Sequence, residues 1–317
     1  MSGDFKLDIV GVGAAKSGTT WTASILKTHP QTCLGHGKEL NYFLELMPPE
    51  MQQRLGTTET KMIPKGEEWL KSKFQHWEPG QKKADFSPGY FMDPGSPRLI
   101  HEHNPDVKLL INLRNPSEAA YSFYYHYIAI HQVDFNDFEE ALKNEALKPS
   151  SQIIDYYKYI DHIERYLKYF QREQIKIILM DDIKADNQAV YRDYCQFLEI
   201  EAVPLGAVTK RANTAKQIRS IRVRNAFYNM NVFLGKYAVT RRILDLVEYN
   251  HYAKRVVGRI KDLNVKRMKY EDISQKSRKQ LIEIYREPNE RLAEFLGRDL
   301  SMWNDPNPKK KKVSKSA

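Results

Sequence analysis

The sequence predicts an α/β protein with a single domain, built on a central parallel β-sheet flanked by helices. Strand-like apolar runs alternate with amphipathic helical segments up to about Pro204, which is the pattern of a parallel sheet. The run Val107 to Leu113 is almost continuously apolar, as expected for a central strand covered on both faces. Neither an internal repeat nor a long linker divides the 317 residues.

The first predicted unit is a strand, a turn and a helix. Phe5 to Gly13 forms the strand, and the helix starts at Thr19, which we expect to be its N-cap. The helix ends at His29, because a residue before proline avoids the helical conformation. The next segments are expected to be, in order, irregular at 32–43, helical at 64–77, turn-rich at 85–90 and helical at 98–103.

The second predicted unit begins with the strand Val107 to Leu113, and Arg114 stands at its carboxyl end. Asn115 is the expected N-cap of the following helix, with Pro116 at the first helical position. The remaining expected elements are a long helix at 153–170, a strand at 175–180, and helices at 187–198, 225–247 and 277–296.

Composition narrows the class of protein. No stretch approaches the roughly 20 apolar residues of a membrane span, and the acidic start MSGDFKLDIV is unlike a signal peptide, so we expect a soluble, cytoplasmic protein. Cys33 and Cys195 match no metal-ligand spacing, so we expect no metal and a reducing compartment. The net charge is +10, but five lysines lie in the last nine residues. Charge alone leaves nucleic acid, a membrane surface or an anionic small molecule as partners.

A candidate phosphate-binding loop lies between the first strand and helix, from Gly11 to Thr20. Backbone N–H groups and the helix dipole favour an anion at such a place. The loop is not a Walker loop, because Ala15 stands where that motif needs a glycine before the lysine. It is not a dinucleotide-binding loop either, because Lys16 occupies the third glycine position. What remains is the order Lys-Ser-Gly-Thr-Thr at the mouth of the helix.

Arg114 provides a second cation after a strand. In open α/β sheets ligands bind beyond the carboxyl ends of strands, so Lys16 and Arg114 would suit one ligand with two phosphate ends. The alternative is that Lys16 is a solvated turn residue and Arg114 an ion-paired strand end.

These blocks resemble the PAPS-dependent sulfotransferases, whose donor is 3′-phosphoadenosine 5′-phosphosulfate (PAPS). The loop at 16–21 resembles the family's 5′-phosphosulfate loop, and Arg114 with Ser122 eight residues later resembles its 3′-phosphate motif. Blocks at 85–91, 284–287 and 297–300 resemble the heparan-sulfate-type and bacterial branch. The resemblance spans residues 5 to 303. It implies a P-loop-NTPase-like sulfotransferase fold, a sulfotransferase domain at 1–303 with a basic disordered tail at 304–317, and 3′,5′-bisphosphoadenosine (PAP) as product.

The resemblance also implies roles for individual residues. Glu39 matches the glutamate that serves as base in the heparan-sulfate-type branch, and Lys16 would stabilise the leaving group. The residues expected to bind the nucleotide are Lys16, Ser17, Gly18, Thr19, Thr20, Trp21, Arg114, Ser122 and Arg219.

Several alternatives to these roles stay open. Glu39 could instead pair with a lysine on the surface, and His36 is a rival base because cytosolic relatives use histidine. His126 lies one turn from Ser122 and would face the same side of the helix. Phe86 departs from several relatives, which carry a lysine there. The residues that would form a basic lid, or merely a solvated loop, are Asn213, Lys216 and Arg219.

The expected function is transfer of a sulfuryl group from PAPS to a hydroxyl or amine of a small-molecule acceptor, which is the expected partner. Alternatives are a P-loop-like nucleoside or small-molecule kinase, a carbohydrate sulfotransferase, and a polyanion-binding module suggested by the lysines after Pro308. We expect neither a nucleic-acid nor a membrane partner. Acceptor identity and oligomeric state are beyond the sequence.

Overall fold

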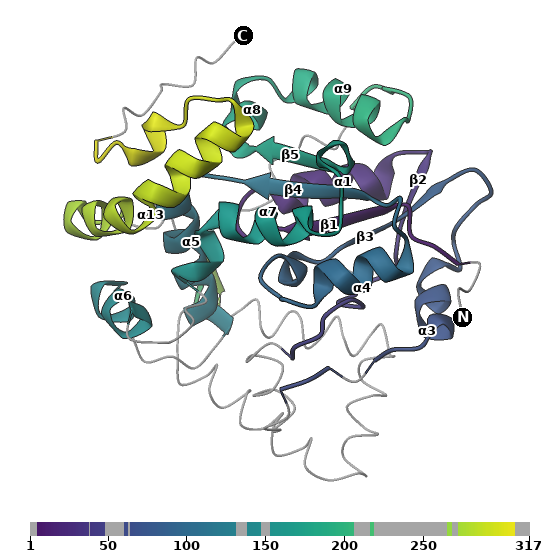
Figure 1. Ribbon diagram of the computed structural model, residues 1–317, viewed down its shortest axis with the longest axis horizontal. Helices are drawn as coiled ribbons and strands as arrows, with labels where there is room; N and C mark the ends of the chain where they lie inside the picture. Colours follow the sequence, from purple (N-terminus) through teal and green to yellow (C-terminus); the bar gives the residue numbers. More distant parts are fainter. Residues whose placement is uncertain are drawn as a thin grey trace.

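The computed structural model describes residues 5–37, 39–47, 60–62, 64–130, 138–146, 153–205, 216–218, 265–267 and 272–307. Five parallel strands form one sheet, in the order β2-β3-β1-β4-β5 (Figure 1). Their bounds are Ile9–Gly13 for β1, Thr32–Leu34 for β2, Lys82–Phe86 for β3, Lys108–Leu113 for β4 and Ile175–Leu179 for β5. Because all five run the same way, their carboxyl ends meet at one edge of the sheet.

Nine named helices and two short strands complete the described elements. The helices are α1 (Thr19–Thr28), α3 (Glu67–Lys71), α4 (Ser96–His103), α5 (Pro116–Ile130), α6 (Phe138–Ala146), α7 (Tyr159–Leu167), α8 (Met180–Ala185), α9 (Asn187–Leu198) and α13 (Gln275–Leu296). Short 3₁₀ turns lie at Ser72–Phe74, Pro88–Phe91, Asp155–Tyr157, Arg172–Gln174 and Ser301–Asn304. Strands β6 (Lys216–Ile218) and β7 (Val265–Arg267) pair with each other, antiparallel.

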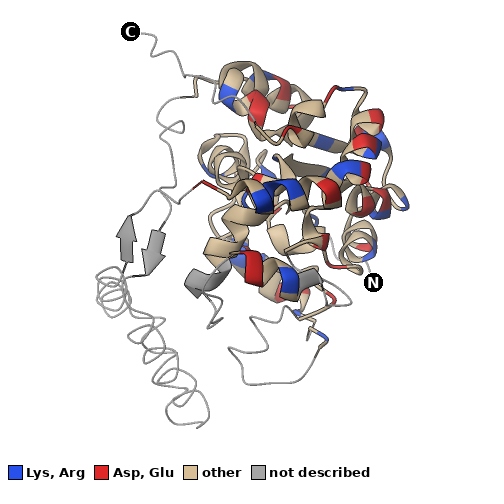
Figure 2. Cartoon of the chain, turned by 90° about the vertical axis from the view of Figure 1, so that its left-hand side faces the viewer, with Lys and Arg blue, Asp and Glu red and all other residues tan. Residues whose placement is uncertain are grey.

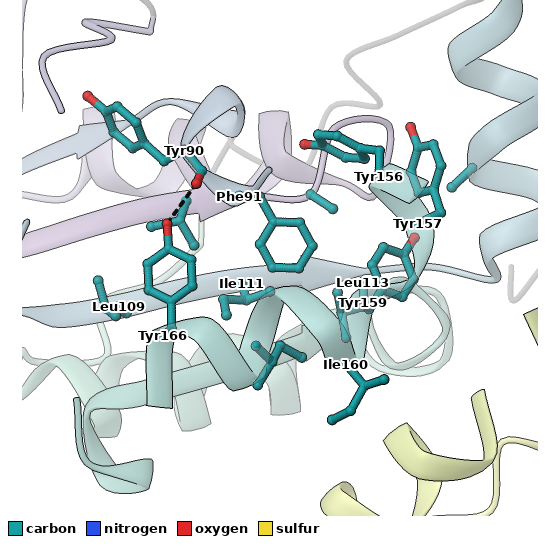
Figure 3. Close-up of a cluster of buried hydrophobic side chains, with 14 of the residues drawn as sticks. Tyr90, Phe91, Leu109, Ile111, Leu113, Tyr156, Tyr157, Tyr159, Ile160 and Tyr166 are labelled. Carbon is teal, nitrogen blue, oxygen red and sulfur yellow. Dashed lines mark hydrogen bonds between the residues drawn. The ribbon is translucent and has the colours of Figure 1, made fainter. Parts of the chain in front are cut away.

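The sheet buries side chains on both faces, as the apolar pattern of β4 predicts. Leu109, Ile111 and Leu113 point to one face and belong to the larger core cluster, whereas Leu110 belongs to the cluster on the other face. On the first face, the cover comes from Ile100 of α4 and from Ile160 and Tyr166 of α7, and Figure 3 shows part of this cluster. On the second face the cover comes from Ile25 and Leu26 of α1 and from Tyr194 of α9.

Two strands lie where the sequence predicts irregular or turn-rich chain. β2 is only three residues long, which is too short for a periodic pattern. β3 reads Lys-Lys-Ala-Asp-Phe, with its three buried residues at the end, so its charges hide the strand signal. The predicted strand at 175–180 ends one residue early, because Met180 opens α8.

The long helix predicted at 153–170 is also wrong. The chain forms a 3₁₀ turn and then α7, because Lys158 lies between them with φ −80° and ψ 70°. The predicted helix at 225–247 lies outside the described residues. Cys33 and Cys195 are both free thiols and both buried. Among the described helices, none has the length and apolar character needed to cross a membrane.

Candidate active site

The loop between β1 and α1 carries Lys16 at the carboxyl edge of the sheet. Lys16 has φ 62°, a value uncommon outside glycine, and Gly18 has φ 92°. Gly18, not the predicted Thr19, occupies the N-cap position, and it offers no side-chain cap. The backbone N–H groups of Ser17, Gly18 and Thr19 find no acceptor among the residues that the structure describes. Consecutive unpaired N–H groups at the start of a ten-residue helix form an anion cradle.

Gly18 is required at its position for two reasons. A Cβ there would lie 2.9 Å from the sulfur of Met180, and the positive φ disfavours any other residue. The loop therefore packs directly onto the start of α8, which fixes the entry of the chain into α1.

Three buried tyrosines form hydrogen bonds with the residues on either side of Lys16. Tyr156 accepts a hydrogen bond from the N–H of Ala15 at 2.8 Å, and Tyr157 donates to the carbonyl of Ala15 at 3.3 Å. Tyr159 lies 3.4 Å from the Ser17 hydroxyl and donates to the carbonyl of Arg114 at 3.0 Å. Burial raises the pKa of Tyr157 and Tyr159, so both remain donors at neutral pH.

Sequence reasoning missed these tyrosines because it placed them in one long helix. Three tyrosines within four residues, in the run Asp-Tyr-Tyr-Lys-Tyr, were the available signal. Figure 3 shows Tyr156, Tyr157 and Tyr159 grouped at one end of the buried cluster. Because Tyr159 contacts both Ser17 and the Arg114 backbone, it links the two cationic segments of the site.

Arg114 lies directly after β4, which is hydrogen-bonded to β1. Its Nη1 atom lies 3.5 Å from the carbonyl oxygen of Lys16, so the guanidinium contacts the backbone of the loop that carries Lys16. Glu118, one turn into α5, accepts two hydrogen bonds from the guanidinium, at 2.8 and 3.1 Å. The ion pair orients Arg114 while its Nη1 edge faces the loop.

The start of α5 is capped as the sequence predicts. The Asn115 side chain accepts hydrogen bonds from the N–H groups of Ser117 and Glu118, at 3.0 and 3.4 Å. Asn115 also donates to the carbonyl of Trp303, at 3.4 Å. The C-terminal segment thus supports the strand end that carries Arg114.

The other residues predicted to bind nucleotide differ in burial and in their hydrogen-bond partners. Ser122 is half-buried on α5 and is not hydrogen-bonded to Arg114. The Ser17 hydroxyl is buried against Tyr159, which leaves its backbone N–H for a ligand. The indole Nε1 of Trp21 is buried without a partner among the described residues. Arg219 and Asn213 lie outside the described residues, and only the backbone of Lys216 is described, in β6.

Glu39 lies on the segment after β2, at the same edge of the sheet. Its side chain is exposed and its φ is 65°. The two histidines that rival it, His36 and His126, are exposed as well. Phe86 is buried, and its ring fills the space beside Gly11 that a Cβ would need. Phe86 is therefore a core residue.

A buried polar cluster at the end of β3 contacts the chain after Glu39. Asp85 is only 1% exposed and accepts hydrogen bonds from the hydroxyls of Tyr90 and Ser87, at 2.6 and 3.1 Å. Burial raises the pKa of Asp85 to about 6, against the opposing effect of these hydrogen bonds. In the described part of the chain, no group of three or more His, Cys, Asp or Glu residues is placed to hold a metal ion.

Comparison with known proteins agrees with this geometry. The sequence profile of the sulfotransferase domain matches residues 6–233. A bifunctional heparan sulfate N-deacetylase/N-sulfotransferase 1 of Caenorhabditis elegans is 26% identical over 210 residues, which are 62% of this chain and 22% of that protein. Human heparan sulfate glucosamine 3-O-sulfotransferase 5 is 28% identical over 180 residues, 53% of this chain and 46% of that protein. The chain thus spans less than half the length of these relatives.

A solved sulfotransferase from Alicyclobacillus acidocaldarius shares the fold. It superposes with a TM-score of 0.66 at 22% identity, over 95% of this chain and all of that one. The comparisons confirm the predicted fold class and the resemblance to heparan-sulfate-type and bacterial sulfotransferases. The chain belongs to the sulfotransferase domain family.

Proposed function

We propose that this protein is a PAPS-dependent sulfotransferase, which transfers a sulfuryl group to a hydroxyl or amine. The observation that carries the proposal is the approach of Arg114 to the Lys16 loop at the ends of two adjacent parallel strands. Two positive sites at that spacing suit the two phosphate ends of PAP. Membership of the family supports sulfuryl transfer over the phosphoryl transfer of a kinase.

In this proposal the backbone N–H groups of residues 17–20 bind the 5′-phosphate of the donor, and Lys16 neutralises the charge that develops on the bridging oxygen. Arg114 and Ser122 bind the 3′-phosphate, which ADP lacks. Trp21 is assigned to the nucleotide side of the site. Arg219, if it closes over the donor, would add a further cation.

Glu39 is proposed as the general base. It takes the proton of the acceptor while the acceptor oxygen or nitrogen forms its bond to sulfur, and the bond from sulfur to the bridging oxygen breaks. The electron pair of that bond leaves with PAP, where Lys16 stabilises it. The placement of Glu39 at the same sheet edge as Lys16 supports this assignment.

A small molecule is the first candidate for the acceptor. A carbohydrate is the second, because the relatives named above act on heparan sulfate and because two lysines lie beside the segment of Glu39. The Nζ atoms of Lys65 and Lys73 lie 4.1 and 4.6 Å from the ring centre of Trp69. Neither lysine forms an ion pair within the described part of the chain. The cytoplasmic location expected from the sequence stays a prediction.

The test is sulfate transfer from labelled PAPS to a panel of phenols, aliphatic alcohols, amines and unsulfated heparan-type oligosaccharides. Transfer to any of these supports the proposed reaction, and the preferred class identifies the acceptor. Transfer of phosphate from ATP to the same panel, without transfer of sulfate from PAPS, would instead favour the kinase.

A further inference from the structure

The four residues after Glu39 are held by side chains of a different segment. Leu40 donates its backbone N–H to Asp85 at 3.4 Å, and Asn41 donates to the Ser87 hydroxyl at 3.0 Å. The N–H groups of Tyr42 and Phe43 both approach the Tyr90 hydroxyl, at 2.7 and 3.3 Å. Four consecutive backbone donors therefore end on three side chains at the end of β3 and just after it.

Asp85 is the centre of this arrangement. Its carboxylate accepts from both Ser87 and Tyr90, at 3.1 and 2.6 Å, so it fixes the direction of the two hydroxyls that bind the segment. All three side chains are buried, at 1% exposure or less. A buried charge of this kind persists only when its hydrogen bonds are satisfied, and here the Leu40 N–H satisfies it in part.

The backbone carbonyl of Leu40 is held by a side chain as well. Lys65 donates to the carbonyl of Leu40 at 2.8 Å, and its ammonium lies over the ring of Trp69. Burial lowers the pKa of Lys65, and the Asp85 charge opposes that change. The residue directly after Glu39 is thus bound through its N–H by Asp85 and through its carbonyl by Lys65.

We infer that Asp85 is a positioning residue for Glu39: through Ser87, Tyr90 and the Leu40 N–H it fixes the backbone that follows Glu39. The inference rests on the proposed role of Glu39 as base. Glu39 has a positive φ and an exposed side chain, so the conformation of its backbone sets where the carboxylate starts from. Only an ionised Asp85 accepts all these hydrogen bonds, because a protonated carboxyl must donate one of its own.

The experiment compares Asp85→Asn with Asp93→Asn. Asp93 is a matched control, because it is also buried and accepts from the N–H groups of Glu45 and Leu46, farther along the same segment. Backbone hydrogen exchange, kcat, acceptor KM and PAP affinity are measured on both variants. In Asp85→Asn we expect the amides of 40–43 to exchange roughly tenfold faster, and in Asp93→Asn those of 45, 46 and 96, because Asp93 also accepts from the Ser96 N–H at 2.7 Å.

The kcat values of the two variants show whether Asp85 positions Glu39 or only supports the fold. We expect kcat of Asp85→Asn to fall by up to about 100-fold with unchanged PAP affinity, as for a misplaced catalytic group, and kcat of Asp93→Asn to stay near that of the wild type. Ser87→Ala, which removes one hydroxyl, gives the same readout at the Asn41 amide if Asp85→Asn does not fold.

Three results would overturn the inference: unchanged exchange at 40–43 in Asp85→Asn, faster exchange there with wild-type kcat, or an equal loss of kcat in the control. Failure of the proposed base is seen separately, as full turnover in Glu39→Gln. In that case the exchange result still reports whether Asp85 holds the segment.

Discussion

Lys16 and Glu39 share an unusual backbone conformation. Among the described residues, the non-glycine residues with positive φ are Lys16, Glu39, Asn41 and Glu199. Such conformations are costly and persist where the surrounding structure imposes them, often at functional sites. Here the tyrosines impose the first, and the Asp85 cluster flanks the second. Both residues proposed to carry the chemistry are thus held by their neighbours.

The proposed roles of these two residues predict different defects. Lys16→Ala should weaken donor binding and lower kcat by about 10²- to 10³-fold, because it removes the positive charge that is proposed to stabilise the leaving group. Glu39→Gln should lower kcat by about 10²- to 10⁴-fold and leave PAP affinity intact. Steady-state kinetics and PAP titration of both variants check this. Full activity in Glu39→Gln would remove it as the base.

Gly18 can be tested against a glycine of nearly equal φ. Gly18→Ala and Gly80→Ala both strain the backbone, with φ 92° and 90°, but a Cβ at Gly80 has nothing within 4 Å. Gly80→Ala should therefore cost about 1 to 2 kcal/mol of unfolding free energy and keep PAP affinity. Gly18→Ala should cost more and also weaken PAP binding, because the loop must move off Met180. Urea unfolding and PAP titration measure both effects, and equal losses in the two variants would contradict this account.

At the scale of elements, β3 and α7 each bury a titratable group, with opposite consequences. Asp85 has its pKa raised to about 6 by burial, so its contribution to stability is full below the ordinary value of 3.8 and lost as pH rises through 6. His162 on α7 has its pKa lowered to about 4, by burial and then by the Arg165 charge, so its contribution is full above 6.5 and lost as pH falls through 4.

Between about pH 4 and 6 the two groups change the free energy of unfolding in opposite directions, each by up to roughly 1.4 kcal/mol per pH unit. Asp85→Asn removes one of them. The variant should therefore lose stability more steeply than the wild type as pH falls from 6 to 4. Urea unfolding at several pH values checks this, and parallel pH profiles for the two proteins would disprove it.

The elements that could be predicted are those with a local signal. The helix Asn187–Leu198 was predicted to the residue, because its polar start and periodic apolar side are both in the sequence. The central strand and the Asn115 cap were predicted for similar reasons. The strand β3 could not be predicted, because its lysines lie at one end and its buried residues at the other, and pairing with β1 and β2 alone makes it a strand.

The same distinction applies to the site. Lys16, Arg114 and Glu39 were found from motifs, since each follows a recognisable pattern in the chain. The supporting side chains were not assigned roles, because Tyr156 and Ala15 are 141 residues apart and meet only in the folded structure. Sequence reasoning thus finds groups proposed to contact the ligand and misses those that hold them.

At the scale of the whole molecule, the sequence carries a net charge of +10. On the side seen in Figure 2, lysines and arginines alternate with acidic residues over the described helices. Five of the lysines lie at 309–315, outside the described residues, so the basic tail at 304–317 and the domain limit near 303 remain predictions. Trp303 is buried, and its Nε1 donates to Asp181 at 3.0 Å, so the fold extends at least to this residue.

In the whole fold, parallel strands end at a common edge, where the Arg114 guanidinium contacts the loop that carries Lys16. A single ligand with two separated phosphates would suit both the loop and Arg114. The central claim is that this ligand is PAP.

Isothermal titration of the full chain with PAP and with ADP tests that claim most directly, with Arg114→Ala as the matched variant. We expect the wild type to bind PAP at least about tenfold more tightly than ADP, and Arg114→Ala to lose that preference while still binding ADP. Equal affinity of the wild type for the two nucleotides would contradict the account.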